Sequence, residues 1–427
     1  MTHRERNVAA GPALLADGVR WIARSPVRAF LTIFFVSVAA AIAVLPFIPP
    51  EWLLPHTRWE TNAVAVSLAT RGTFADPYAL PSGPTAHVPP AMPALLALIY
   101  AVFGLTVTAG YVTWSVQVAA AATMVAMLPW LSHRLGAGRE AGVIGGLAGA
   151  LVPRWAHQVE CLAGVTLGLL LAWHVARWRA KRPSTLGALV LGVTWGAAFH
   201  LTPSLLPVLI GCLLFEAWWR TDRSRWTRVA VTVLGVVVAC APWAWRNHAV
   251  FGEVLFVRGN FGLELRMGNH EGAPADIDLT DIPGQQIERH PRTNLAEARR
   301  LQDLGEREYM REARREATAW IRANPDTFMA LTARRALYFW FGSPSEGPLA
   351  ALSALLTVLA AVGLHRLWPV LGSPQRAAFA IPLLAFPLVY YVVIFMPRYR
   401  VPLTGLLLVS AGSAIWGRMI DRHTPGH

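Results

Sequence analysis

Apolar runs of about 17 to 22 residues recur along this chain, and each is long enough to cross the roughly 30 Å hydrocarbon core of a bilayer as a helix. The composition agrees with residence in a membrane, because 54% of the 427 residues are hydrophobic and only 15% are charged. Soluble domains carry about 25% charged residues. The sequence therefore predicts an all-α polytopic membrane protein.

We place ten transmembrane spans on these apolar runs. They lie near residues 29–48, 108–131, 140–153, 162–176, 186–200, 203–219, 229–245, 348–364, 377–395 and 401–417. Their orientation follows from the short loops, because Arg and Lys there are retained in the cytoplasm. Arg20, Arg24 and Arg28 precede the first span, and Arg418 and Arg422 follow the last. Both termini are therefore predicted to be cytoplasmic.

The net charge of +13 comes mostly from residues that flank the predicted spans, since nearly all basic residues lie between apolar runs or in one long loop. A role beside the lipid bilayer explains this distribution better than nucleic-acid binding, and we expect no nucleic-acid partner. The three cysteines lack metal-ligand and disulfide spacing. Phosphate-binding loops, dinucleotide fingerprints, serine-hydrolase elbows and zinc-protease motifs are missing from the sequence, which disfavours an ATP-driven pump and a soluble hydrolase.

Two external segments divide the chain into three parts. Residues 1–245 form a transmembrane module with a first external loop at 49–107, residues 246–347 form an external subdomain, and residues 348–427 form the last spans and a cytoplasmic tail. The apolar stretch 89–104 is short, and the charges of the flanking loops leave no crossing for it. We therefore lay it along the outer membrane face.

The first external loop carries an amphipathic helix with a carboxylate at its start. Drawn as a helix from Trp59 to Arg71, the sequence places Glu60, Ser67 and Arg71 on one stripe, which suits the membrane interface. Glu60 is there either a general base for a hydroxyl or a carboxylate that satisfies free backbone amides. His87 follows in the proline-rich turn PSGPTAHVPP, where it either orients a substrate or phosphate or serves as a packing residue.

Arginines alternate with aromatic residues and glycines where the long external loop begins. Arg246 and Arg258 belong to this stretch, and their guanidinium groups suit a phosphate or pyrophosphate, although solvated arginines on a turn-rich scaffold explain it almost as well. Further along, Asn294 to Ala323 is rich in Glu, Arg and Ala. That composition predicts one helix, which ends before Asn324-Pro325.

Two further groups of polar residues lie at predicted membrane boundaries. Glu160 lies outside, just before the fourth span, and Arg398, Tyr399 and Arg400 lie between the last two spans. Charges near lipid are costly unless they are paired or hydrated, which makes these residues functional candidates. A lipid phosphate is a fitting partner for the arginines. Snorkelling to the interface and, for Glu160, simple hydration are the structural alternatives.

These motifs together resemble the GT-C class of membrane glycosyltransferases, in particular the family of aminoarabinose transferases and protein O-mannosyltransferases. The most specific pieces are WETNAVAVSLATRGTFADPY and PSGPTAHVPPAMPALLALIYAVFG, supported by NFGLELRMGNHEG and RYRVPL. The resemblance implies a GT-C fold, two interfacial helices in the first external loop and a catalytic acidic residue at the start of the first. By motif match that residue is Glu60. Many relatives carry an Asp-Glu pair where this chain has Trp59-Glu60, and Glu160 fits the place of a second acidic residue.

The resemblance also implies an activity, the transfer of a sugar from a polyprenyl-phosphate donor to an envelope lipid, glycan or protein at the outer face of the bacterial inner membrane. Glu60 and Glu160 are then the expected catalytic residues. The expected substrate-binding residues are His87, Arg246, Arg258, Arg398, Tyr399 and Arg400. Metal dependence varies across this class, so a divalent metal stays open. A transporter or flippase of lipid-linked glycan, and an inactive scaffold of an envelope glycan complex, are the alternatives from other classes.

Overall fold

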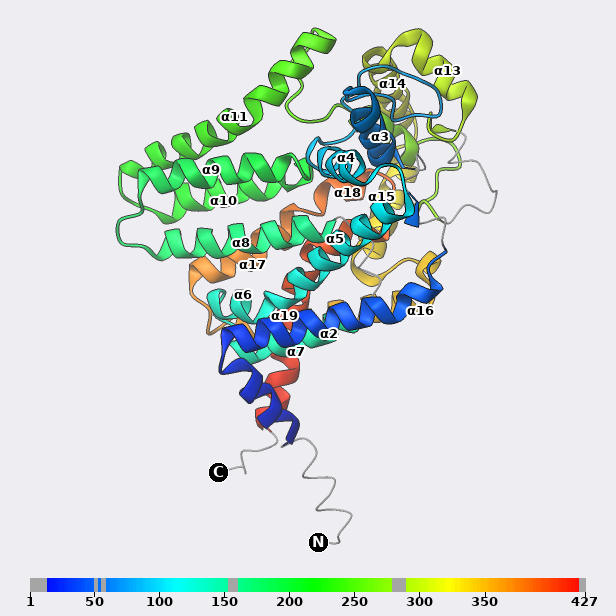
Figure 1. The fold of residues 1–427 in the computed structure, drawn as a ribbon. Coiled ribbons are helices and arrows are strands. Elements are labelled where there is room, and N and C mark those ends of the chain that lie inside the picture. The colour runs from blue at the N-terminus through cyan, green and yellow to red at the C-terminus, as the bar shows by residue number, and fades with distance from the viewer. Residues whose placement is uncertain (1–13, 50–52, 55–58, 153–159, 279–288, 422–427) are drawn as a thin grey trace.

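The computed structural model of the protein describes residues 14–49, 53–54, 59–152, 160–278 and 289–421. Over these residues the secondary structure is helical, with two isolated β-bridges and no sheet. In Figure 1 the first and the last described residues, drawn in dark blue and red, lie at the lower edge of a bundle of long helices. Helices α3 (Glu60–Arg71), α13 (Leu295–Leu304) and α14 (Glu306–Ala323) gather at the opposite end.

The chain is a multi-pass membrane protein, because six helical stretches among the described residues are long and apolar enough to cross a bilayer. They are α2 with η1 (Pro26–Phe47), α5 with α6 (Val107–Arg134), α8 (Glu160–Arg179), α11 (Ser224–Phe251), α16 (Pro348–Leu367) and α17 with α18 (Ser373–Val392). The remaining helices of the bundle are α7 (Arg139–Ala150), α9 (Thr185–Phe199), α10 (Leu206–Trp219) and α19 (Val401–Asp421). The short apolar helix α4 (Ala91–Phe103) packs against α3 and the start of α5, and its place along the outer membrane face stays a prediction. Each predicted span falls on a helix, and a full set of ten crossings stays a prediction.

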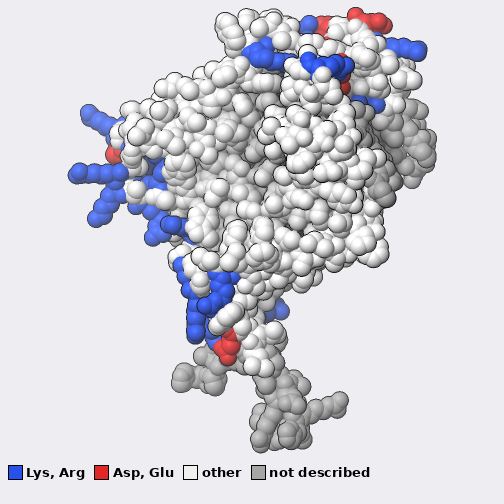
Figure 2. Space-filling model, in the orientation of Figure 1, with Lys and Arg blue, Asp and Glu red and all other residues white. Residues whose placement is uncertain are grey.

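Charged residues lie at the two ends of the bundle. Figure 2 shows a broad band without charge across this face of the molecule, as the lipid-facing surface of a membrane protein requires. Lys and Arg gather on one side of the band, over the loops that follow α8 and α10. On the other side, around α13 and α14, acidic and basic residues are mixed.

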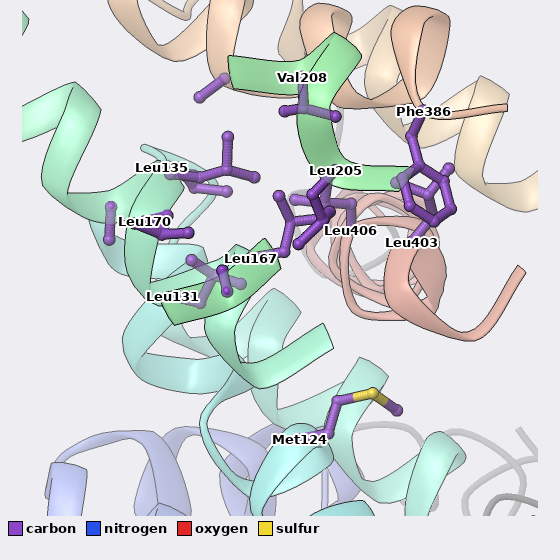
Figure 3. Close-up of a cluster of buried hydrophobic side chains, with 14 of the residues drawn as sticks. Met124, Leu131, Leu135, Leu167, Leu170, Leu205, Val208, Phe386, Leu403 and Leu406 are labelled. Atoms are coloured by element: carbon purple, nitrogen blue, oxygen red, sulfur yellow. The ribbon is translucent and has the colours of Figure 1, made fainter. Parts of the chain in front are cut away.

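Leucines from several helices form the main core. Figure 3 shows Leu131 of α6 (Leu128–Arg134) and Leu135, which follows that helix, beside Leu167 and Leu170 of α8, with Leu403 and other residues of α10 and α19 nearby. All are buried. Because α8 lies among the other helices here, the position of its first residue, which faces the external end, is fixed by packing.

Helices α9 and α11 cross at glycines, which let their backbones approach closely. A Cβ added at Gly192 would lie 2.1 Å from the carbonyl oxygen of Thr232, and one added at Gly235 would lie 2.4 Å from that of Leu189. Any larger residue at either position would push the helices apart. Small residues commonly mediate helix packing inside membranes in this way.

The segment that we predict to be external, residues 246–347, which we name the external subdomain, differs from the sequence prediction at Gly305. We expected one helix from Asn294 to Ala323, but Gly305 adopts a φ of 76° and ends α13 before α14 begins. A residue without Cβ takes this left-handed conformation at little cost, whereas most others are strained there. The break turns Glu306, the first residue of α14, toward the first external loop.

The predicted span at 377–395 also ends earlier than expected. Helix α18 (Leu388–Val392) stops at Val392, and the chain then runs extended. Phe395 pairs in parallel with the segment at Asp276: its N–H donates to Ala275 O at 3.0 Å, and its carbonyl accepts from Ile277 N at 3.2 Å. This pairing ties the segment before Arg398 to the external subdomain.

Helix α12 (Phe261–Gly268) connects the first external loop with α13 and α14. Its Leu263 and Met267 share a buried apolar cluster with Tyr78 of the first loop and Tyr309 of α14. The first loop therefore packs on the subdomain as one body. Helix α15 (Pro325–Phe341) then returns the chain to the bundle, with Pro325 in its first turn as the sequence indicates.

Candidate functional site

Glu60 is the first residue of α3, as the sequence predicts. Trp59 precedes the helix in an extended conformation and gives no side-chain cap. The Glu60 carboxylate faces the ring of His290, with Oε1 3.6 Å from Nε2, and the two side chains are 22% and 20% exposed. Among the described residues, the Glu60 carboxylate thus lies against the ring of His290 and accepts no hydrogen bond from the amides of its own helix.

His290 comes from the external subdomain and was missed by sequence reasoning. It begins a turn in which the N–H of Thr293 donates to the carbonyl of His290 at 3.0 Å. Arg292, in the same turn, donates from its guanidinium to the carbonyls of Pro77 at 3.0 Å and Tyr78 at 2.8 Å. Its backbone N–H donates to Nδ1 of His290 at 3.0 Å. The signal in the sequence was a His-Pro pair just before the helix cap at Asn294.

His87 lies buried next to this pair, in the proline-rich turn. Its Nδ1 is 3.1 Å from the hydroxyl of Tyr78, and its ring centroid is 6.0 Å from that of His290. Burial, and then the nearby charges of His290 and Arg258, hold the pKa of His87 well below its usual value. Burial likewise raises the pKa of Tyr78, helped by the carboxylates of Glu306 and Glu60. The two groups therefore meet as a neutral pair.

Glu306 holds the turn that carries His87. Its carboxylate accepts from the Thr85 hydroxyl at 2.5 Å and from the Ala86 N–H at 2.8 Å, and Thr85 in turn accepts from the N–H of His87 at 2.9 Å. Burial raises the pKa of Glu306 against the opposing hydrogen bonds. A buried carboxylate of the subdomain thus determines where a first-loop histidine lies.

Arg246, expected at a phosphate, is engaged by the same turn. Its guanidinium donates to the carbonyls of Thr85 at 2.7 Å and Phe74 at 3.0 Å, and it lies over the ring of Trp243 at 5.1 Å. These contacts use donors on both terminal nitrogens of the guanidinium and tie Arg246 to the first loop. Its role at a phosphate stays a prediction.

Glu160 and Arg398, far apart in the sequence, face each other. Glu160 Oε1 lies 3.6 Å from Arg398 Nε, and the arginine side chain is 47% exposed. Partial desolvation by the surrounding protein opposes the charge of Arg398, but the carboxylate of Glu160 and, with it, those of Glu60 and Glu264 raise the pKa of Arg398 overall. Arg398 thus feels the field of both predicted catalytic carboxylates.

Tyr399 and Arg258 border the same region. Burial and the charge of Glu264 raise the pKa of Tyr399, while Arg398 and Arg258 oppose that rise. Arg258 donates to Asn260 Oδ1 at 2.5 Å and to Glu264 Oε1 at 3.1 Å. Its guanidinium is therefore partly committed to neighbouring side chains.

Arg400 has different partners from those of Arg398. It donates to the buried carboxylate of Glu346 at 2.5 Å and to the carbonyl of Tyr338 at 3.3 Å. With Glu346 only 1% exposed, this is a buried ion pair. Arg400 therefore fastens the end of the segment that presents Arg398.

Seven of these residues form what we name the external site, because their charges and rings act on one another from six separate segments. They are Glu60, His87, Glu160, Arg258, His290, Arg398 and Tyr399. The site offers a carboxylate base, neutral ring groups and a guanidinium that keeps exposed surface. These groups suit proton removal beside a developing negative charge.

Three residues of the external site have a spacing that a metal ion tolerates. One ligand atom each from Glu60, His87 and His290 lies within 4.8 Å of the others. A metal needs an unprotonated ring nitrogen. Nδ1 of His290 accepts the N–H of Arg292, so the neutral ring carries its proton on Nε2, toward Glu60. A metal would have to displace that proton, so the geometry favours a proton-sharing group.

The fold defines a multi-pass membrane protein, and ionisable and ring side chains from distant segments gather at one end of its helix bundle. Over 89 residues the chain is 37%, 36% and 35% identical to undecaprenyl phosphate-alpha-4-amino-4-deoxy-L-arabinose arabinosyl transferases from three strains of Pseudomonas aeruginosa. The matched stretch covers 20% of this chain and 16% of the length of each relative. The chain thus has distant, partial similarity to lipid-phosphate-sugar glycosyltransferases. No family model and no solved structure matches it.

Proposed function

We propose that this protein is a membrane glycosyltransferase that moves a sugar from a polyprenyl-phosphate donor to a hydroxyl of an envelope lipid, glycan or protein, at the outer face of the inner membrane. The observation that carries the proposal is that Glu60 lies against His290 within the electrostatic reach of Arg398. A base and a cation for a leaving group thus face the same region. The partial similarity to transferases named for an undecaprenyl-phosphate sugar supports the donor class.

In the proposed reaction Glu60 removes the proton of the acceptor hydroxyl as its oxygen attacks the anomeric carbon of the donor sugar. The new carbon–oxygen bond forms while the bond from the anomeric carbon to the phosphate oxygen breaks. The electron pair leaves with polyprenyl phosphate, and the anomeric configuration inverts. General-base catalysis of this kind contributes roughly 10²–10⁴-fold to a rate.

Arg398 is the cation best placed to neutralise the departing phosphate. Arg246 and Arg400 are held by carbonyls and by Glu346, whereas Arg398 is 47% exposed and its 3.6 Å contact with Glu160 is longer than a hydrogen bond. A phosphate can therefore take over the guanidinium without breaking a tight pair. Glu160 then keeps Arg398 turned toward the external site between turnovers.

The proposal is tested by incubating the purified protein with polyprenyl-phosphate sugars and measuring released polyprenyl phosphate. Glu60→Gln should lower the rate by about 10²–10⁴-fold. Glu308→Gln is the matched control, because this carboxylate pairs with Arg311 and Arg315 on the surface of α14. Undiminished release by Glu60→Gln would sink the base assignment. Movement of lipid-linked sugar between leaflets without release would identify a transporter, and neither activity would identify a scaffold.

A further inference from the structure

The two ring nitrogens of His290 meet different partners, and this fixes where the ring proton lies. Nδ1 accepts the backbone N–H of Arg292 at 3.0 Å. A ring nitrogen that accepts a hydrogen bond presents its lone pair, so the neutral ring carries its proton on Nε2. Nε2 is the atom that faces Glu60, 3.6 Å from Oε1.

The turn that contains His290 enforces this arrangement. The carbonyl of His290 accepts the N–H of Thr293 at 3.0 Å, which closes the turn. The guanidinium of Arg292 donates to the carbonyls of Pro77 and Tyr78. A proton on Nδ1 would set that N–H against the N–H of Arg292. The backbone thus selects one tautomer and points its donor at the carboxylate.

We propose that His290 is a positioning residue, whose Nε2–H holds the Glu60 carboxylate toward the acceptor hydroxyl during glycosyl transfer. The proposal rests on the function proposed for Glu60. A distance of 3.6 Å is longer than a hydrogen bond, and contacts of this kind in substrate-free sites commonly tighten once substrate binds. Both side chains are about one-fifth exposed, at 20% and 22%, which leaves room for that movement.

The arrangement makes the external subdomain a contributor to catalysis and not only a cover. Glu60 belongs to the first loop, and the group that orients it belongs to the segment before α13. Arg292 links the two by binding first-loop carbonyls. The subdomain must therefore dock on the first loop before the base is held in place.

Two variants of His290 separate its turn contact from its contact with Glu60. His290→Asn keeps an acceptor for the N–H of residue 292, since asparagine forms the same turn with its own side chain, but it cannot reach Glu60. His290→Gln loses that local bond and extends an amide N–H to the place of Nε2. His248→Asn, an exposed residue near the end of α11, is the control.

Turnover of a polyprenyl-phosphate sugar should fall about tenfold in His290→Asn through kcat, with KM for the donor changed less than about twofold. His290→Gln should recover most of the lost kcat, which a purely structural role of the turn does not explain. Wild-type kcat in His290→Asn would overturn the proposal. So would a loss in His290→Gln that is as large as in His290→Asn, or activity of the wild type that is abolished by a chelator and restored by zinc.

The ring tautomer gives a readout that does not depend on turnover. Nitrogen NMR of ¹⁵N-histidine-labelled protein, with the His290 signal assigned by its loss in His290→Gln, should place the proton on Nε2. A proton on Nδ1 would overturn the proposal even in an active enzyme. A wild type that fails to turn over any donor while showing the Nε2 proton would refute the proposed function and, with it, the catalytic role of His290.

Discussion

The two ends of helix α8 carry charged residues in opposite situations. At its start Glu160 faces Arg398 at 3.6 Å, and the two side chains are 26% and 47% exposed. Near its other end Arg177 lies 3.1 Å from Glu216 of α10, and those side chains are 6% and 2% exposed. Glu216 also meets Arg228 of α11 at 3.4 Å. The first group is open and loosely paired, and the second, which we name the closed cluster, is shut off from solvent.

Under the proposed function, this difference separates the external site from a cluster that only stabilises helix packing. Buried ions that pair with one another join α8, α10 and α11, and removing one partner leaves an uncompensated charge. Ions that stay exposed and further apart keep the capacity to bind a ligand. The residue types are the same at both ends, so burial and distance, rather than the presence of charge, mark the external site.

The largest effect is expected from breaking the closed cluster. Glu216→Gln removes the carboxylate charge between Arg177 and Arg228 and should lower the free energy of unfolding by about 3–5 kcal/mol. Turnover per folded molecule should stay unchanged, because the external site is at the far end of α8. Thermal unfolding in detergent measures the loss, with Glu140→Gln at the start of α7 as the control. An unfolding temperature equal to that of the wild type would mean that the closed cluster does not stabilise the packing of these helices.

Removing the exposed guanidinium of Arg398, at the other end of α8, should reduce turnover and leave stability nearly unchanged. Arg398→Gln should lower turnover by about 10²–10³-fold, the effect of losing one group that stabilises developing charge, with little change in unfolding temperature. Arg311→Gln is the matched control, since the exposed fraction of its side chain is 48% against 47% for Arg398. If Arg398→Gln unfolds the protein as Glu216→Gln does, the contrast between the two ends fails.

A smaller effect is expected from a change at Glu306, which holds the turn that carries His87. Glu306→Gln replaces one carboxylate oxygen by an amide N–H donor. That oxygen accepts either the N–H of Ala86 or the hydroxyl of Thr85, and loss of this hydrogen bond should cost about 1–3 kcal/mol of stability. The turn that carries His87 should loosen, which hydrogen exchange of residues 84–88 would detect. Thr85→Ser, which keeps the hydroxyl, should leave the exchange rate near that of the wild type. Equal exchange in both variants would show that Glu306 does not hold this turn.

The smallest expected effect is a difference in acid sensitivity between the two ends. Burial lowers the pKa of His87, so the unfolded chain takes up a proton near pH 6.5 that the folded site refuses. Its contribution to stability is present above pH 6.5 and is lost as pH falls below that value. The raised pKa of Glu306 acts in the opposite direction, so the difference between wild type and His87→Asn isolates the histidine.

Hydrogen exchange at pH 7 and pH 5 measures this difference. The segment around Tyr78 and His87 should open more readily at pH 5 in the wild type, and His87→Asn should remove most of the change. The pKa of Asp222, beside the closed cluster, is lowered by its hydrogen bond with Arg228, so that end should respond only in more acid solution. Equal opening of both segments between pH 7 and pH 5 would contradict this prediction.

Much of the framework could be predicted from the sequence, because span length and loop charge are local properties. Glu60 at the start of its helix, and Glu160 at the start of a span, are correctly positioned by the same local patterns. The contact between Glu60 and His290 could not be predicted, since it joins segments far apart in the chain and neither carries a periodic signal. Similarly, nothing local distinguishes Arg398, which keeps exposed surface, from Arg400, which is paired with Glu346.

The external site is assembled from distant segments, and this has a consequence for how the protein is made. A ribosome completes Glu60 early and Arg398 near the end, so the base resides in the membrane long before the cation that would receive the leaving group. Under the proposed function, a nascent chain halted before residue 398 therefore holds the proposed base without the proposed cation, and we expect it to be unable to complete sugar transfer.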